Sequence, residues 1–334
     1  MERQREAAAR PPVDRRAVAA ATVTVVLWAS AFVAIRSAGR EFSPGALALG
    51  RLTAGSATLL LLCLVRREGL PPRAAWPGIL VSGLLWFGVY NVVLNWGEQE
   101  VDAGTAAMVV NVGPILVALL GGWLLKEGLP GRLLAGIAVS FSGAVVVGLS
   151  LSDGGPDGGS ATLGVALCLL AAVTYAVGVV SQKPTLRHGS PLQVTAYSCL
   201  VGTVACLPFA GRLAGELADA PLAATLDMVY LGVFPTALAF TTWAYALART
   251  SAGKMGATTY AAPALVVLMS WALLGEVPGP LTLAGGVLCL AGVAVSRGGF
   301  AAVRARIARR SPAPAPAAPV PAAEEPAAEA ARSR

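Results

Sequence analysis

The chain has 334 residues, of which 56% are hydrophobic and only 13% are charged, and its formal net charge is +7. About a quarter of the residues of a water-soluble domain are charged, so this composition and the mean hydropathy of +0.68 exclude an ordinary soluble protein. The positive charge lies in tails and short loops, where it contacts lipid headgroups and directs insertion, so we expect no nucleic-acid partner.

Ten apolar segments follow one another along the chain, each about 20 residues long and therefore able to cross roughly 30 Å of hydrocarbon as a helix. They cover residues 18–36, 44–65, 74–97, 103–125, 131–150, 161–182, 191–210, 222–248, 255–275 and 280–296. No segment has the alternating pattern of a barrel strand. The predicted fold class is therefore all-α, an integral membrane bundle of ten transmembrane helices.

The two halves of the chain are similar to each other. Residues 102–148 align without a gap to residues 251–297, so that Pro114 aligns with Pro263. Each repeat contains five predicted helices, an odd number, so the second repeat must enter the membrane upside down relative to the first. Inverted repeats in a membrane protein indicate a transporter first of all.

The repeats divide the chain into four predicted parts. Residues 1–17 form a basic tail, 18–150 the first repeat and 161–298 the second, and 299–334 form a tail that is basic and then rich in Pro and Ala, as disordered segments are. With a cytoplasmic N-terminus, the inner loops hold most of the Lys and Arg, and the outer loops collect acidic residues such as Glu98. We therefore predict a multi-pass protein of the cell membrane with both termini in the cytoplasm.

The chain contains several short motifs, some of them at matching places in the two repeats. They are Trp28-Ala29-Ser30-Ala31-Phe32, Ser43-Pro44 followed by Arg51, Pro114 followed by Gly121-Gly122-Trp123-Leu124-Leu125-Lys126-Glu127, and Pro263 followed by Leu273-Leu274-Gly275-Glu276. Together with the duplication, this pattern resembles the EamA family of the drug/metabolite transporter superfamily over roughly residues 18–298. The resemblance implies a metabolite carrier, commonly an exporter of amino acids or related small solutes, with a cavity between the halves. A drug or nucleotide-sugar carrier of the same fold is the alternative.

Arg51 is the only formally charged side chain well inside a predicted helix. A cation near the bilayer interior costs about 3 kcal/mol or more, so it must face protein or water. Its guanidinium could pair in bidentate fashion with a substrate carboxylate. It could instead be a structural arginine that bonds free carbonyls or extends to the surface. Both interpretations stay open at this point.

Pro114 and Pro263 lie near the middle of the fourth and ninth predicted helices. A proline lacks an N–H and so frees the carbonyl four residues before it. Asn111 and Tyr260, which are equivalent in the repeat, lie beside these free carbonyls. We predict that both kinks and their polar neighbours line the transport path, with a packing kink as the alternative.

The third predicted helix carries aromatic and amide side chains spaced four residues apart, Trp86 with Tyr90 and Asn91 with Asn95. Such adjoining stripes can hold a small amphipathic solute by stacking and hydrogen bonding, although buried aromatic residues also serve simply as core. Two aromatic residues at equivalent places in the first helix of each repeat are expected to close the same space: Trp28 and Tyr175.

Glu127 and Glu276 end equivalent helices and are predicted to stand at opposite membrane faces. The C-terminus of a helix disfavours an anion, so each glutamate needs a partner. We interpret both as gate or structural residues.

The predicted helices lack paired carboxylates, a histidine cluster and a Ser/His pair, so we expect neither an enzyme nor a metal or cofactor. The absence of a carboxylate in mid-helix favours facilitated diffusion or exchange over tight proton coupling. The expected partners are a small-molecule solute and the lipid bilayer. A stripe of small residues in the fifth helix suits close packing within the bundle or between two copies, which leaves a homodimer open: Gly136, Ser140, Ala144 and Gly148.

Overall fold

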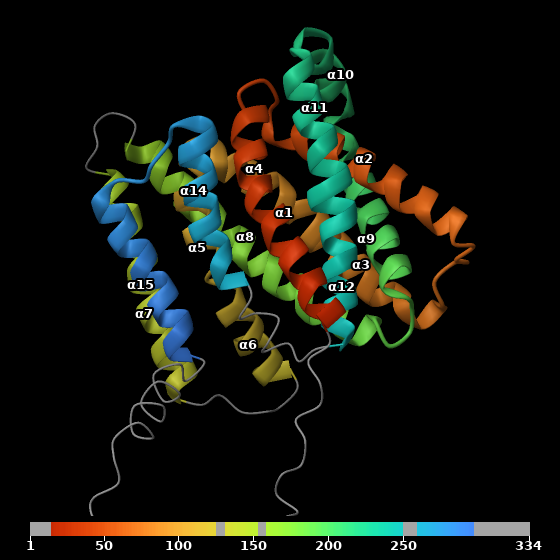
Figure 1. The fold of residues 1–334 in the computed structure, drawn as a ribbon, viewed down its shortest axis with the longest axis horizontal. Helices are drawn as coiled ribbons and strands as arrows, with labels where there is room; N and C mark the ends of the chain where they lie inside the picture. Colours follow the sequence, from red (N-terminus) through yellow and green to blue (C-terminus); the bar gives the residue numbers. More distant parts are fainter. Residues whose placement is uncertain (1–14, 125–130, 153–157, 250–258, 297–334) are drawn as a thin grey trace, which may run out of the picture. The chain divides into compact units, whose positions relative to one another are not determined.

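The computed structural model describes residues 15–124, 131–152, 158–249 and 259–296, and every regular element in these ranges is helical (Figure 1). The α-helices are α1 (Arg15–Ala38), α2 (Pro44–Val65), α3 (Trp76–Ser82), α4 (Tyr90–Glu100), α5 (Ala103–Val110), α6 (Gly113–Leu124), α7 (Gly131–Ser152), α8 (Gly158–Thr185), α9 (Pro191–Cys206), α10 (Ala210–Asp219), α11 (Leu222–Leu231), α12 (Ala239–Arg249), α14 (Ala262–Leu274) and α15 (Pro280–Ser296). Two π-helical segments, η3 (Gly83–Val89) and η5 (Gly232–Leu238), and three short 3-10 turns, η2 (Arg73–Ala75), η4 (Leu207–Phe209) and η6 (Thr259–Ala261), connect them.

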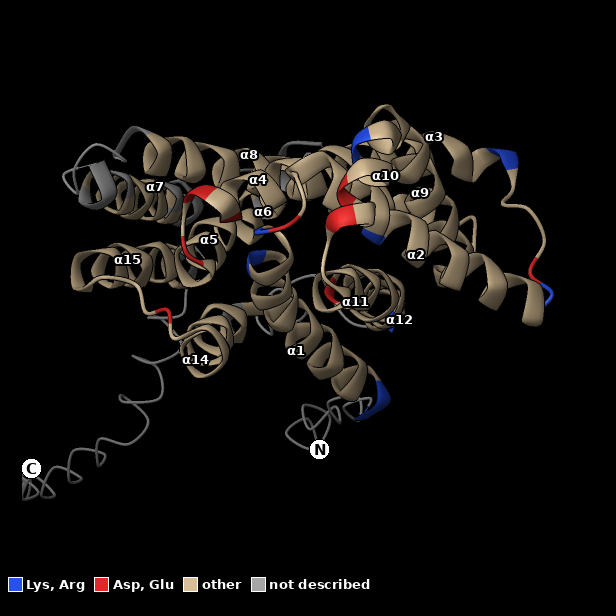
Figure 2. Ribbon diagram, turned by 90° about the horizontal axis from the view of Figure 1, so that it is seen from above, with Lys and Arg blue, Asp and Glu red and all other residues tan. Residues whose placement is uncertain are grey.

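Seven helical runs in the described chain are long and apolar enough to cross a membrane. They are Arg15–Ala38, Pro44–Val65, Arg73–Glu100, Ala103–Gly121, Ser160–Thr185, Pro191–Asp219 and Leu222–Arg249. Three shorter apolar helices lie within the remaining predicted spans: Ala138–Val147, Ala262–Leu274 and Pro280–Gly292. Charged residues gather at helix ends and in connecting segments (Figure 2). The all-helical class and the multi-pass membrane character are confirmed, whereas the number of ten spans stays a prediction.

Local sequence signals explain where several helices begin and end. Asp102 caps α5 by accepting a hydrogen bond from the Thr105 backbone N–H at 2.9 Å. Ser190 and Gln193 form a reciprocal capping box at the start of α9. Gly275 ends α14 with a φ of 70°, a left-handed conformation that glycine adopts without steric cost.

The same close contact between helices occurs twice in the bundle. A Cβ atom on Gly83 of η3 would lie 2.7 Å from the carbonyl oxygen of Ser198 in α9, and one on Gly232 of η5 would lie 2.4 Å from that of Arg51 in α2. Arg51 and Ser198 are equivalent in the alignment that matches the two Ser-Pro pairs, and the two glycines are equivalent in the alignment that matches Pro114 with Pro263. Each π segment therefore packs its glycine against the backbone of a helix from the other half of the chain.

The small-residue stripe of α7 packs against α15, and the two helices lie side by side (Figure 1). The Ser140 hydroxyl donates to the Cys289 carbonyl at 2.7 Å, and a Cβ atom on Gly143 would lie 2.6 Å from the Cys289 nitrogen. The small-residue stripe therefore packs against a helix of the same chain. A homodimer stays a prediction.

Candidate functional site

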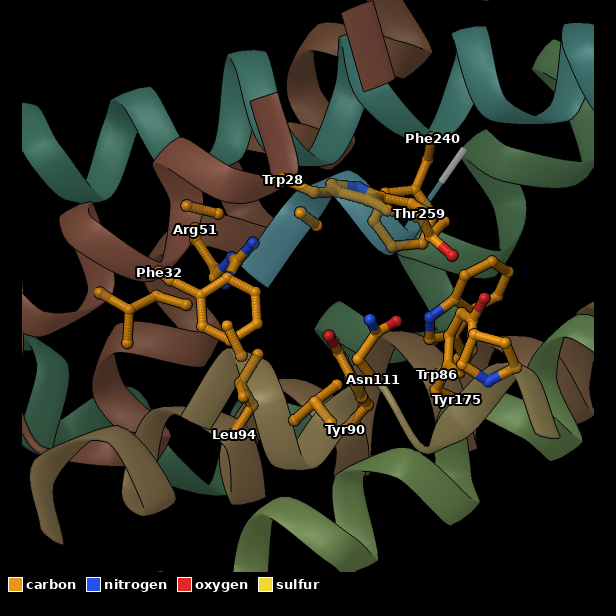
Figure 3. A pocket seen from close by; sticks show the side chains of 16 residues that line it. Trp28, Phe32, Arg51, Trp86, Tyr90, Leu94, Asn111, Tyr175, Phe240 and Thr259 are labelled. Carbon is orange, nitrogen blue, oxygen red and sulfur yellow. The ribbon is translucent and has the colours of Figure 1, made fainter. Parts of the chain in front are cut away.

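A cavity lies among helices from both halves of the chain (Figure 3). Its lining residues are Trp28, Ala31, Phe32, Ile35, Arg51, Trp86, Tyr90, Leu94, Ala107, Val110, Asn111, Pro114, Tyr175, Phe240, Thr259 and Ala262. Because α1, α2, α4 and α5 supply one part of the wall and α8, α12 and α14 another, the cavity exists only when the two halves pack together.

Most of the residues that the sequence nominated for substrate binding line this cavity. The structure brings together Trp28, Arg51, Trp86, Tyr90, Asn111, Tyr175 and Pro114. Pro263 is buried in the first turn of α14 without reaching the cavity. Tyr260 belongs to η6, but its side chain lies outside the described residues, as does the whole of Glu127.

Asn91 and Asn95 do not line the cavity. The Asn91 amide donates to the Phe87 carbonyl at 2.7 Å, and the Asn95 amide donates to the Pro44 carbonyl at 3.1 Å. Both side chains are buried, at 2% and 0% exposure. The NH2 groups of these two amides thus bond the backbone of η3 and α2 rather than the cavity.

Arg51 points into the cavity from α2 and is only 4% exposed (Figure 3). Its Nη2 donates to the Thr236 hydroxyl at 3.3 Å, while Nε and Nη1 have no hydrogen-bond partner among the residues that the structure describes. No carboxylate among the described residues forms a salt bridge with it. The guanidinium therefore does not extend to the surface, and two of its three nitrogens remain available to a ligand.

Two more buried donors in the cavity wall lack partners within the described part of the chain. They are Trp28 Nε1 and Asn111 Nδ2. An unsatisfied buried polar group costs about 1–3 kcal/mol, so each of these donors favours a bound molecule that supplies an acceptor. Together with Arg51, they make a cavity suited to an anionic group or to several hydrogen-bond acceptors.

The rest of the wall is largely aromatic. Trp86 is in edge contact with Tyr175, with ring centroids 5.4 Å apart, and with Trp28 at 6.5 Å. Phe240 lies 4.8 Å from Trp86 and 5.4 Å from Trp28. Such edge and tilted contacts stabilise a rigid aromatic wall. Phe240 was missed in the sequence, although it is the repeat equivalent of Asn91 and could have been found from that alignment.

The helix at Pro114 is broken rather than kinked. α5 ends at Val110, and α6 begins at Gly113, so that Pro114 occupies the first turn of a new helix. Proline fits there because the first N–H groups of a helix have no intrahelical partner. The same arrangement is found at Pro263, which lies in the first turn of α14. The N-terminus of α6 therefore lies at the cavity, where its positive dipole end favours an anion.

The two π segments hold polar groups beside the cavity. In η5, the Thr236 hydroxyl donates to the Leu231 carbonyl at 2.8 Å while it accepts from Arg51. In η3, the Asn91 amide bonds the carbonyls of Phe87 and Trp86. Single-turn π segments often lie at functional sites. Here η3 contains Trp86, from one half of the chain, and η5 contains Thr236, the hydrogen-bond partner of Arg51, from the other half.

Glu276 follows the C-terminus of α14, where a negative charge needs a cationic partner, and it has one. Arg36 Nε donates to Glu276 Oε1 at 3.1 Å, and Arg36 Nη1 donates to the carbonyls of Glu98 and Gln99 at 2.8 and 3.2 Å. This contact, which we call the Arg36 latch, ties α1 and α4 to the segment after α14. It links the two halves at one end of the bundle.

The placement of Glu98 in an outer loop is wrong. Glu98 belongs to α4 and is 0% exposed, and no described residue forms a hydrogen bond with either of its carboxylate oxygens. A signal was present in the sequence, because Glu98 follows Asn91 by seven residues and therefore lies on the same helix face. Leu94 and Asn95, which lie between them on this face, are also buried.

A multi-pass helical bundle whose halves enclose a cavity lined by aromatic rings and a few polar groups is typical of a solute transporter. The chain belongs to the EamA-like transporter family, whose model matches it twice, at residues 15–149 and 162–298. It is 38% identical over 280 residues to a probable terminal-alkyne amino-acid exporter of Streptantibioticus cattleyicolor, covering 83% of this chain and 92% of that protein. It is 26% identical over 290 residues to a probable amino-acid metabolite efflux pump of Salmonella typhimurium, covering 84% of this chain and 94% of that protein. A solved crystal structure with 23% identity has the same fold, with a TM-score of 0.58 over 84% of this chain and 96% of that chain.

Proposed function

We propose that this transporter exports amino acids or related small metabolites by alternating access through the cavity between two inverted repeats. The observation that carries the proposal is the chemistry of the unpaired groups in the cavity wall. Arg51, Asn111 and Trp28 all present buried hydrogen-bond donors without partners. A carboxylate matches them, because its two oxygens accept a bidentate pair from a guanidinium and further bonds from neutral donors.

The remaining cavity wall suits the rest of such a solute. Rings of Trp86, Tyr175 and Phe240 give an apolar surface for a side chain. The names of two relatives also support amino-acid export. A drug or nucleotide-sugar carrier of the same fold is the second candidate. Many drugs are cations, however, and the positive charge of Arg51 repels cations.

The proposed topology has two inverted five-helix repeats, both termini in the cytoplasm and the Arg36 latch at the outer face of the cell membrane. The duplicated packing of Gly83 and Gly232 supports it, because an inverted repeat requires equivalent contacts. The two family matches of similar length support it as well. In this topology, breaking the contact of Arg36 with Glu276 opens the cavity outward.

Export is tested directly in cells that overproduce the protein. The test compares the growth tolerance and the efflux of a panel of radiolabelled amino acids, including L-propargylglycine as a terminal-alkyne amino acid, with those of cells carrying an empty vector. We expect faster efflux and greater tolerance for at least one member with an apolar or unsaturated side chain. Equal efflux for every member, with the protein present in the membrane, would refute the proposal.

Trp28→Phe tests whether an indole N–H reaches the substrate. The ring stays aromatic, but one unpaired donor is lost, so we expect the half-saturating substrate concentration to rise about 2- to 10-fold, which corresponds to one hydrogen bond. Trp243→Phe is the matched control, because its buried Nε1 also lacks a partner but does not line the cavity. Equal effects of the two substitutions would show that Trp28 does not donate to the substrate.

A further inference from the structure

We propose that Glu98 is a proton-binding site linked to anion binding at Arg51, so that the transporter moves a proton together with its substrate. This inference rests on the proposed function and deepens it. It also revises the expectation of facilitated diffusion or exchange without tight proton coupling, which rested on the absence of a carboxylate in the middle of a predicted helix.

Glu98 is inside the protein without the contacts that normally hold a buried carboxylate. The side chain is 0% exposed, and in the described ranges neither Oε1 nor Oε2 has a hydrogen-bond partner. Leu94, one helical turn earlier on α4, lines the cavity, so Glu98 lies about 6 Å farther along the helix axis. Because an isolated ionised carboxylate is costly inside a protein, Glu98 needs either a proton or a cation.

Two arginines act electrostatically on Glu98, and they differ in availability. Arg36 already pairs with Glu276 and donates to two backbone carbonyls. Arg51 keeps two nitrogens free. The charged and titratable groups that interact with Glu98 are Arg36 of α1, Arg51 of α2, Tyr90 of α4, Asp102 at the start of α5, Cys168 of α8 and Glu276 after α14. Asp102 and Glu276 act against a charge on Glu98, which leaves Arg51 as its available counter-ion.

Packing alone does not call for a carboxyl group at this place. The gapless alignment of the repeats, continued four residues back, matches Glu98 with Leu247. Leu247 is also buried, at 7% exposure, on α12. The same place in the fold therefore accepts an apolar side chain. Arg51 likewise aligns with an uncharged residue of the other repeat, Ser198. The charged pair therefore occurs in one repeat only. A requirement of the fold would apply to both repeats, so this asymmetry favours a functional role.

Arg51 can neutralise either the Glu98 carboxylate or a substrate carboxylate, but one positive charge does not balance two negative ones. When the substrate carboxylate takes Arg51, Glu98 binds one proton from water and becomes a neutral carboxyl group. When the substrate leaves, Arg51 is free to act on Glu98 again, and the proton returns to water on the side of release. By linkage, substrate binding and proton binding promote each other. The two move in the same direction, and the outward gradient of the substrate drives export.

Infrared difference spectroscopy of the full-length protein in liposomes tests the proton site without any substrate. We expect a protonated-carboxyl band that disappears as the pH is raised and that is missing in Glu98→Gln. The matched control is Glu100→Gln on the same helix, whose carboxylate accepts from Trp96 Nε1 at 3.2 Å, and it should keep the band. In Arg51→Gln the band should persist to higher pH, because the counter-ion of the carboxylate has been removed.

Binding of radiolabelled L-propargylglycine to the same liposomes tests the linkage. The apparent dissociation constant of the wild type should rise with pH, by up to about tenfold per pH unit for one linked proton. Glu98→Gln, which mimics the protonated form, should bind with the tight value at every pH, and Glu100→Gln should behave as the wild type does.

Two results would overturn the proposal: an infrared band that Glu98→Gln leaves in place, or a pH dependence of binding that survives in that variant. Failure of the proposed function would look different. A wild type that binds and exports no member of the amino-acid panel, but that keeps the Glu98 band and its shift in Arg51→Gln, would retain the proton site and refute amino-acid export.

Discussion

Arg51→Gln is expected to lower export of the preferred amino acid by about 10- to 100-fold at a subsaturating concentration, because hydrogen bonds to a charged group contribute about 1.5–3 kcal/mol. The lost interaction is the bidentate contact between the guanidinium and the substrate carboxylate. Arg51→Lys keeps the charge but loses the paired geometry, so its efflux should be intermediate. Efflux from preloaded proteoliposomes measures all three proteins.

The effect of Arg51→Gln on stability separates a binding role from a structural one. Among the described residues, Nε and Nη1 of Arg51 have no partner, so removing the charge relieves a desolvation cost, and Glu98 then binds a proton in place of its counter-ion. The thermal unfolding temperature in detergent should therefore stay unchanged or rise while transport falls. Arg212→Gln is the control, because the Arg212 side chain is exposed on α10 and should affect neither property. A large drop in unfolding temperature with normal efflux would show that Arg51 is structural.

Gly232→Ala is expected to destabilise the protein by about 1–3 kcal/mol, the usual cost of inserting a methyl group into a packed core. The new Cβ would lie 2.4 Å from the Arg51 carbonyl oxygen and 2.6 Å from the Ala54 Cβ, so relief requires a movement of the α2 backbone. Gly83→Ala should have a similar effect, because its Cβ would lie 2.6 Å from the Val201 Cβ and 2.7 Å from the Ser198 carbonyl oxygen.

Gly211→Ala on α10 is the matched control for both substitutions. It has no neighbouring atom within 4 Å and is exposed, so alanine should stabilise this helix slightly, by about 0.5–1 kcal/mol. Thermal unfolding in detergent measures the three variants. If Gly232→Ala and Gly83→Ala both unfold as the wild type does, the two π segments do not pack as described.

The cavity was partly predictable from the sequence. Arg51 stood out because a charge inside an apolar segment is costly and rare, and Trp28 and Tyr175 stood out because the repeat pairs them. Phe240 could have been found only as the repeat equivalent of Asn91, since an aromatic residue in an apolar helix is ordinary. The roles of Asn91 and Asn95 could not be assigned either, because their spacing places them on a helix face but does not say whether the backbone or the cavity lies opposite.

Composition, hydropathy and the internal repeat by themselves determined that the chain is an all-helical membrane protein of a transporter family, because lipid permits few backbone structures and duplication leaves a readable alignment. Only the tertiary structure decided that Glu98 is buried, that the helix breaks before Pro114 and that Arg51 keeps two free nitrogens. These properties depend on which helices meet. The sequence does not show whether a residue near the end of a membrane span contacts water, lipid or a neighbouring helix. Only the packing of the helices distinguishes these surroundings.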